Sequence, residues 1–217
     1  MDNASAKTCW IFGGGEFAPA CPHTPAPQDL VIAADSGYLL VKRLGIKPDL
    51  VIGDFDSLGE KPTGETVVTL PVEKDVTDAA AAVSEGRRRG YSRFLFVGCS
   101  GGRPDHTFAA YQTLADLAER GESGLLFENG FTVTAVRDGT LVFPARESGT
   151  FAVFAVGGAA LGVTLSGVYY PLSEETLTPT FPLGVSNSFI GKPARVTVGN
   201  GTLLVFAEGY PLPSFGK

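Results

Sequence analysis

Short apolar runs alternate with stretches of helical periodicity up to about residue 125. The apolar runs lie at 9–13, 29–34, 49–53, 66–70 and 93–98. The helical patterns lie at 36–45, 77–90 and 104–121. Strands that alternate with helices in this way predict βα units, whose parallel strands form one sheet. We therefore expect an α/β N-terminal domain with a mainly parallel sheet and flanking helices.

The pattern changes after about residue 125, where no convincing helix follows. Short β-rich segments with Gly, Asn and Pro between them lie at 125–136, 140–145, 150–157, 160–167, 194–201 and 202–209. This pattern of short strands and turn residues is typical of a smaller all-β sandwich domain. We therefore expect two domains, residues 1–125 and 126–217. Residues 168–193 read as a long connection between strands, and connections of this length are uncommon unless functional.

Composition narrows the class of protein. The 217 residues are 44% hydrophobic, which is ample for a packed core. Cys9, Cys21 and Cys99 are odd in number and widely spaced, which argues against a disulfide framework and favours a reducing compartment. The N-terminus has no basic region followed by an apolar run, and no apolar segment is long enough to span a bilayer. These features predict a soluble, cytoplasmic protein without a membrane partner.

Charge argues against nucleic acid as a partner. The net charge is −6, and the one basic cluster, Arg87–Arg89, closes a predicted helix, where a solvated helix end explains it. Two histidines without clustered cysteines make a zinc site improbable. His23 lies in the Pro-rich loop 19–27, where we expect only solvent exposure.

Polar residues follow each predicted strand. These strand ends are Gly13–Glu16, Ala34–Gly37, Gly53–Ser57, Lys74–Asp78 and Gly101–His106. Each has an ordinary alternative: Asp75 or Thr77 as a helix N-cap, Asp35 as another cap, Pro104 as a first-turn residue. Because parallel sheets bind ligands beyond the carboxyl ends of their strands, the five together predict a site.

In the stretch DLVIGDFDS, residues 49–57, an apolar run is followed directly by two acids. In an extended chain Asp54 and Asp56 leave the same face, while Phe55 points the other way, toward packing. Two carboxylates side by side are tolerable when a hard cation lies between them. The alternative is a turn, since Gly-Asp and Asp-Ser are common loop formers.

A polyphosphate held by Mg²⁺ suits this chemistry. Mg²⁺ takes one or two carboxylates plus phosphate oxygens, which matches Asp54, Asp56 and a third acid such as Asp75. Glycines and helix N-termini let backbone N–H groups approach phosphates, and Arg103 can grip phosphate with its planar guanidinium. The ligand would be a nucleoside triphosphate, but the sequence has neither a P-loop nor the GxGxxG spacing of a dinucleotide site.

The motifs ADSG, GDFDS, KDVTD, GGRPDH and GVSNSF occur in this order. In order and separation they resemble the thiamine pyrophosphokinase family, and the resemblance covers nearly the whole chain. It implies an N-terminal α/β domain that binds ATP and Mg²⁺ and a C-terminal β-sandwich domain for thiamine and dimerisation. It also implies a homodimer whose active sites lie at the subunit interface. The implied reaction converts ATP and thiamine into AMP and thiamine diphosphate.

The resemblance implies roles for individual residues. The catalytic acids, which would coordinate Mg²⁺ and the phosphates, are Asp54, Asp56 and Asp75. The residues on the nucleotide side are Asp35, Ser36, Gly37, Thr77, Arg103, Asp105 and His106. Two departures bear on nucleotide contacts: the turn reads ADSG where ADGG is frequent, and Ala110 stands where Asn is frequent.

On the substrate side, the resemblance implies that Ser186, Asn187 and Phe189 meet thiamine. The Phe189 ring offers a flat face to a cationic heterocycle, but an aromatic packed inward is the equal alternative. Two other functions remain open. One is a pyrophosphokinase for another hydroxymethyl heterocycle such as a pterin, and the other is a non-catalytic nucleotide or thiamine diphosphate sensor. The three metal-directed acids argue against a sensor.

Overall fold

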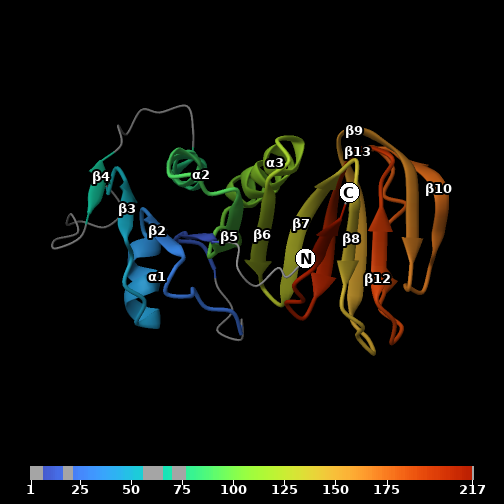
Figure 1. Cartoon of the computed structure of the whole chain (residues 1–217), viewed down its shortest axis with the longest axis horizontal. Helices are drawn as coiled ribbons and strands as arrows, with labels where there is room; N and C mark the ends of the chain where they lie inside the picture. Colours follow the sequence, from blue (N-terminus) through green and yellow to red (C-terminus); the bar gives the residue numbers. More distant parts are fainter. Residues whose placement is uncertain (1–6, 17–21, 56–65, 70–76, 217) are drawn as a thin grey trace. The chain divides into compact units, whose positions relative to one another are not determined.

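The computed structural model describes residues 7–16, 22–55, 66–69 and 77–216 (Figure 1). Within them the chain is mostly strand, with three α-helices. The chain divides into two compact units, Met1–Thr113 with Leu126–Asn129, and Leu114–Leu125 with Gly130–Lys217. No helix within the described residues is both long and apolar enough to cross a membrane.

The apolar runs of the first unit form parallel strands. They are β1 (Cys9–Phe12), β2 (Leu30–Ala34), β3 (Leu50–Gly53), β4 (Val67–Thr69) and β5 (Arg93–Val97). The order across the sheet is β5–β1–β2–β3–β4, and every neighbouring pair is parallel. Strands β1, β2 and β3 are buried along their whole length, as continuous apolar runs predict for a sheet covered on both faces.

Three helices follow these strands, α1 (Gly37–Leu44), α2 (Asp78–Arg88) and α3 (Pro104–Glu119). Helix α1 packs against β1 and β2, and α2 packs against β1, β2 and β3. The chain moves outward from β2 through α1 to β3, then returns from β4 through α2 to β5. Right-handed connections in opposite directions place their helices on opposite faces, as Figure 1 shows for α1 and α2. A crevice forms where the direction of winding reverses.

The C-terminal end of α2 carries the basic cluster of the sequence. Its C-terminal turn carries Arg88 and Arg89, and both guanidinium groups pair with Glu85 at 2.7 Å. The hydrogen bond from Arg88 lowers the pKa of Glu85 to about 2. The basic cluster is therefore the solvated helix end that the sequence predicts.

The second unit is built from antiparallel strands. The strands that follow β5 along the chain are β6 (Ser123–Glu128), β7 (Phe131–Arg137), β8 (Thr140–Phe143), β9 (Thr150–Ser166), β10 (Leu172–Leu177), β11 (Asn187–Ser188), β12 (Ala194–Thr197), β13 (Asn200–Glu208) and β14 (Ser214–Gly216). One sheet runs β7–β13–β9, with β11 on the far side of β9. The other runs β14–β8–β12–β9–β10. Their buried side chains form one core, as in a β-sandwich.

Strand β9 corrects the prediction of two separate strands at 150–157 and 160–167. It is one strand of 17 residues that belongs to both sheets. Its first part pairs with β13, and Thr164–Ser166 pair with β12. Gly157, with φ of 76°, bends the strand between these parts without ending it. A glycine pair therefore marks a bend here rather than a turn.

Two further expectations are wrong. Residues 168–193 are not only a connection, because they contain β10 and β11. Apolar and polar residues alternate only weakly in β10, an edge strand with exposed Glu174 and Glu175. Its sequence therefore gives little signal for a strand. His23 is half-buried and its ring stacks on Phe127, with centroids 5.1 Å apart, rather than being merely exposed to solvent.

Candidate functional site

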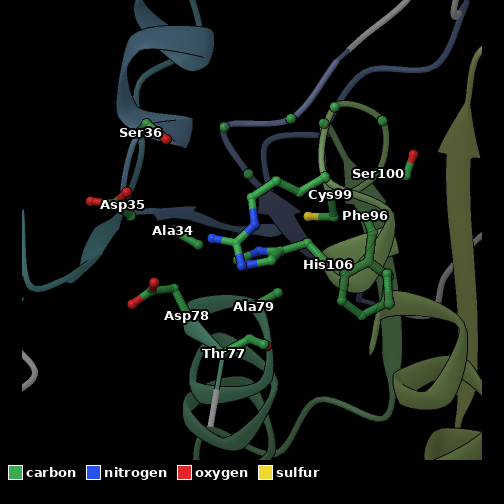
Figure 2. A pocket seen from close by; sticks show the side chains of 18 of the residues that line it. Ala34, Asp35, Ser36, Thr77, Asp78, Ala79, Phe96, Cys99, Ser100 and His106 are labelled. Carbon is green, nitrogen blue, oxygen red and sulfur yellow. The ribbon is translucent and has the colours of Figure 1, made fainter. Parts of the chain in front are cut away.

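A cavity of about 430 Å³ lies in the first unit (Figure 2). Its walls come from the turns after β1, β2 and β5 and from the starts of α2 and α3. Figure 2 shows His106 reaching in from one side, Asp35 and Ser36 on another, and Thr77–Ala79 on a third. The cavity therefore occupies the crevice expected beyond the carboxyl ends of parallel strands.

Gly13–Gly15 form the wall after β1. The Gly13 N–H donates to Val97 O at 2.8 Å, and the Gly15 N–H donates to Gly98 O at 2.6 Å. A Cβ on Gly14 would collide with the Ser36 side chain. Glycine is therefore required at position 14 for the turn after β1 to meet the turn after β2 at the cavity. Sequence reasoning noted this strand end and gave its glycines only the general role of letting backbone N–H groups approach phosphates, without naming them as site residues.

The turn after β2 brings Asp35 and Ser36 to the cavity. Asp35 adopts φ of 48°, and its N–H donates to Ile52 O at 2.7 Å. The N-cap position of α1 is Ser36, without a side-chain capping bond, so the alternative of Asp35 as the cap is wrong. Gly37 does not line the cavity. A Cβ there would collide with the Phe12 carbonyl, so Gly37 lets α1 begin directly against β1.

The start of α2 supplies Thr77, Asp78 and Ala79 to the wall. Thr77 is the N-cap, and its Oγ1 accepts a hydrogen bond from the Ala80 N–H at 3.2 Å. The capping alternative for Thr77 is therefore confirmed. Capping does not remove it from the cavity, because a helix N-terminus presents unpaired N–H groups that favour an anion. Sequence reasoning included Asp78 in the stretch Lys74–Asp78 without giving it a role, and it missed Ala79.

A stripe of residues along α3 forms the next wall. Arg103 precedes the helix, and His106, Ala110 and Thr113 follow at helical spacing. Residues three, seven and ten apart share one face of a helix. The helical period could therefore have extended the predicted site from His106 to Ala110 and Thr113.

Asp105 lies outside the cavity lining and pairs with Arg103. Nη2 of Arg103 lies 2.6 Å from Oδ2 of Asp105, and Nε lies 3.2 Å from Oδ1. This hydrogen bonding lowers the pKa of Asp105 to about 2. Both side chains are largely exposed, so the pair contributes little to stability. It instead limits the directions in which the guanidinium can point.

Cys99 also lines the cavity. Burial raises the pKa of its thiol to about 12, so the thiol is neutral at physiological pH. Its sulfur lies 3.8 Å from Ile11 O and 3.7 Å from Val97 O, to which the S–H donates weakly. Cys99 is therefore a packed wall residue and not a thiolate nucleophile.

The predicted metal acids are only partly within the described residues. Asp54 follows β3 and is half-buried, outside the cavity lining, whereas Asp56 and Asp75 lie outside the described residues. Phe55 is 4% exposed, which confirms that it packs inward. Its φ of 63° departs from the extended backbone that we expected, because the chain turns directly after β3. The described residues contain no group of three or more His, Cys, Asp or Glu side chains that could hold a metal.

The predicted substrate residues lie in the second unit, around β11. Asn187 is 5% exposed. Its Oδ1 accepts from the Tyr170 N–H at 2.9 Å, and its Nδ2 donates to Tyr170 O at 2.7 Å. Ser186 is exposed and adopts φ of 59°. Asn187 therefore fixes the backbone of Tyr170, and Ser186 is the member of the set whose side chain is open to solvent.

Phe189 is 3% exposed and belongs to the core of the second unit. Its ring meets Phe151 edge to face, with centroids 5.2 Å apart. The alternative of an aromatic packed inward fits this burial.

Two family profiles match the chain. The profile described as "Thiamin pyrophosphokinase, catalytic domain" matches residues 23–123, and "Thiamin pyrophosphokinase, vitamin B1 binding domain" matches residues 140–203. The chain is also 25% identical over 208 residues to the thiamine pyrophosphokinase of Bacillus subtilis, covering 92% of this chain and 97% of that protein.

Solved structures with the same fold carry similar names. The Bacillus subtilis thiamine pyrophosphokinase superposes with a TM-score of 0.84 at 23% identity, covering 93% of this chain and 99% of that one. The Geobacillus thermodenitrificans thiamin pyrophosphokinase gives 0.80 at 22% identity, covering 94% and 98%. The yeast enzyme gives 0.75 at 17% identity, covering 96% and 88%. Identities this low establish the fold alone.

Proposed function

The chain belongs to the thiamin pyrophosphokinase family, and from this premise we propose that it transfers pyrophosphate from ATP to the hydroxyl of thiamine. The products are AMP and thiamine diphosphate. The observation that carries the proposal is the cavity at the carboxyl ends of β1, β2 and β5, within the part of the chain that matches the catalytic profile. The vitamin B1 profile over residues 140–203 favours thiamine over a pterin.

The cavity is proposed as the nucleotide site. Its glycine turns and the start of α2 offer N–H groups to phosphate oxygens, and Arg103 offers a planar cation. Asp35, Ser36, Thr77 and His106 complete the predicted nucleotide side. Gly37 and Asp105 act indirectly, through the backbone packing of α1 and through the orientation of Arg103.

The metal is proposed to be Mg²⁺, held by Asp54, Asp56 and Asp75. Three carboxylates with phosphate oxygens form the hard oxygen donor set that this ion prefers, so the residues fit the ion. When bound, Mg²⁺ neutralises charge on the phosphate oxygens. Asp54 is the only one of the three among the described residues, and its half-buried position directly after β3 suits a ligand that must remain ionised.

In the proposed reaction, the hydroxyl oxygen of thiamine attacks the β-phosphorus of ATP. A new O–P bond forms, and the bond between the β-phosphorus and the oxygen bridging to the α-phosphate breaks, so AMP departs. The hydroxyl proton passes to a carboxylate of the acid cluster, with Asp54 and Asp75 as candidates, although a loose transition state needs little help from a base. The remaining task of the chain is to hold the nucleophile in line.

The division of labour is proposed to follow the two predicted domains. Residues 1–125, with a mainly parallel sheet and flanking helices, bind nucleotide and metal. Residues 126–217 bind thiamine at the segment that carries Ser186, Asn187 and Phe189, where Ser186 is exposed and the buried Asn187 and Phe189 hold the segment in place, and they form a homodimer interface. We place the protein in the cytoplasm. Exposed aromatic side chains in the second unit support a dimer, since Tyr169, Tyr170 and Phe181 are 63%, 62% and 65% exposed.

The test is AMP release from ATP and Mg²⁺ with thiamine present, absent or replaced by a hydroxymethylpterin. We expect AMP only with thiamine, and none after chelation of divalent cations. AMP formed only with the pterin would overturn the substrate. Folded protein that binds ATP but forms no AMP with either acceptor would favour the sensor alternative.

A further inference from the structure

The loop between β8 and β9 holds the backbone around Phe189 at two points. The Gly149 carbonyl accepts a hydrogen bond from the Phe189 N–H at 3.0 Å, and the Arg146 carbonyl accepts one from the Gly191 N–H at 2.7 Å. Next to them, Asn187 and Ser188 pair with the start of β9. The predicted thiamine segment is therefore fixed along one side by a single loop.

The side chain of Arg146 makes a further contact with the same segment, in addition to the backbone hydrogen bonds. Its Cζ lies 5.8 Å from the centroid of the Phe189 ring. It also lies against Gly209, where an added Cβ would stand 2.6 Å from Cζ. Gly209 adopts φ of 88°, so both its conformation and its missing side chain leave room for the guanidinium. The guanidinium thus contacts an aromatic ring and a bare stretch of backbone.

A close ion pair does not account for the position of Arg146. No ion pair of Arg146 occurs within the described part of the chain, and its Nε is buried there without a hydrogen-bond partner. A buried donor without a partner costs stability. Arg146 has two favourable neighbours: the Glu208 carboxylate, which its charge attracts, and the Phe189 ring, because a cation near an aromatic face is attracted to it.

Resting on the proposed function, we propose that Arg146 is a positioning residue for thiamine. It holds the Phe189 ring against Phe151, where the centroids lie 5.2 Å apart, and thereby sets the position of Ser186 and Asn187 in the same segment. Arg146 does not itself touch thiamine. Because none of these residues lines the nucleotide cavity, the effect of Arg146 falls on thiamine and not on ATP.

The experiment compares Arg146→Met, Arg146→Lys and the control Arg195→Met. Arg195 is an exposed arginine on β12 in the same unit, without a role in the site. The readouts are KM for thiamine, KM for ATP, kcat, and direct thiamine binding by titration calorimetry. We expect Arg146→Met to raise KM and Kd for thiamine roughly three- to thirtyfold, with KM for ATP unchanged. Arg146→Lys keeps a cation near the ring and restores most of the loss, and Arg195→Met changes neither constant.

A double-mutant cycle with Phe189→Leu separates positioning from general destabilisation. If Arg146 acts through the ring, Arg146→Met adds little to the thiamine defect of Phe189→Leu. Unchanged thiamine constants in folded Arg146→Met, or equal losses for ATP and thiamine, would overturn the inference. A wild-type protein that binds thiamine but releases no AMP would refute the proposed function, and the binding comparison would still decide the role of Arg146. Absence of thiamine binding in the wild type would refute both.

Discussion

Asp54, directly after β3, is the proposed metal ligand that the described residues include. Replacing Asp54 or Asp56 with Asn removes one ligand charge at a polar strand end, so we expect turnover to fall by about a hundredfold or more with the fold intact. Steady-state AMP release at saturating substrates is the measurement, with circular dichroism as the check on folding.

The matched control is Asp49→Asn, directly before the same strand. The Asp49 carboxylate accepts a hydrogen bond from the Val31 N–H at 2.8 Å, and an Asn oxygen can accept the same bond. Turnover should therefore stay near the wild-type value. If Asp54→Asn and Asp56→Asn also keep near wild-type turnover, the assignment of Asp54 and Asp56 as metal ligands is wrong.

Arg103 is expected to act on ATP affinity. Arg103→Gln keeps a polar side chain at the cavity but removes the charge that faces phosphate, so KM for ATP should rise about tenfold while KM for thiamine stays constant. Arg120→Gln is the control, because Arg120 forms a similar exposed pair, with Asp116, at the end of the same helix. Equal effects of the two substitutions on KM for ATP would contradict a specific role for Arg103.

The pair of Arg103 with Asp105 predicts a pH dependence. The hydrogen bond from Arg103 lowers the pKa of Asp105 from 3.8 to about 2. Because the folded pKa is depressed, any contribution of the pair is present above pH 3.8 and is lost as pH falls toward 2. Carboxyl ¹³C NMR should show Asp105 titrating near 2 in the wild type and closer to 3.8 in Arg103→Gln. Titration near 3.8 in both would mean that the pair does not persist in solution.

At the residue scale, sequence reasoning pointed to the cavity that we propose for the nucleotide, because several of its polar residues come directly after strands. Asp35, Ser36, Thr77, Arg103 and His106 all line the cavity. Ala79 and Phe96 were not predicted, because small and apolar side chains carry no chemical signal, whereas Ala110 was noted only through the family resemblance. The packing of Phe189 could not be decided from sequence either, since its burial depends on Phe151 and Val168, which are distant along the chain.

At the element scale, the start of α1 depends on Gly37. A methyl group at this position would collide with the Phe12 carbonyl on β1, so Gly37→Ala should lower the free energy of unfolding by about 1–3 kcal/mol. Chemical denaturation measures this loss. The control is Gly158→Ala in β9, where an added Cβ meets nothing within 4 Å. A loss for Gly158→Ala as large as that for Gly37→Ala would contradict the close approach.

The elements of the first unit follow from the sequence more directly than those of the second. Strands buried on both faces read as unbroken apolar runs, which is why β1, β2, β3 and β5 are evident. In β9 the exposed residues Gly157, Gly158 and Ala159 break the pattern, although the strand continues. Pairing partners decide whether such a segment bends or ends, and partners are not encoded locally.

At the scale of the whole molecule, we predict a homodimer. Sedimentation equilibrium should give twice the chain mass of 22.7 kDa. Replacing exposed Tyr169 and Phe181 with Ser should weaken the association, because both side chains leave large apolar surfaces open in the single chain. A monomer at concentrations where the enzyme is fully active would exclude an active site shared between subunits.

Strand β9 pairs with β13 in one sheet and with β12 and β10 in the other. Neither sheet can therefore open without loosening a strand that the other also uses. The second unit is thus expected to unfold as one cooperative body rather than sheet by sheet. Amide hydrogens in the buried part of β9 should exchange with solvent only when the whole unit opens, so they should rank among its slowest.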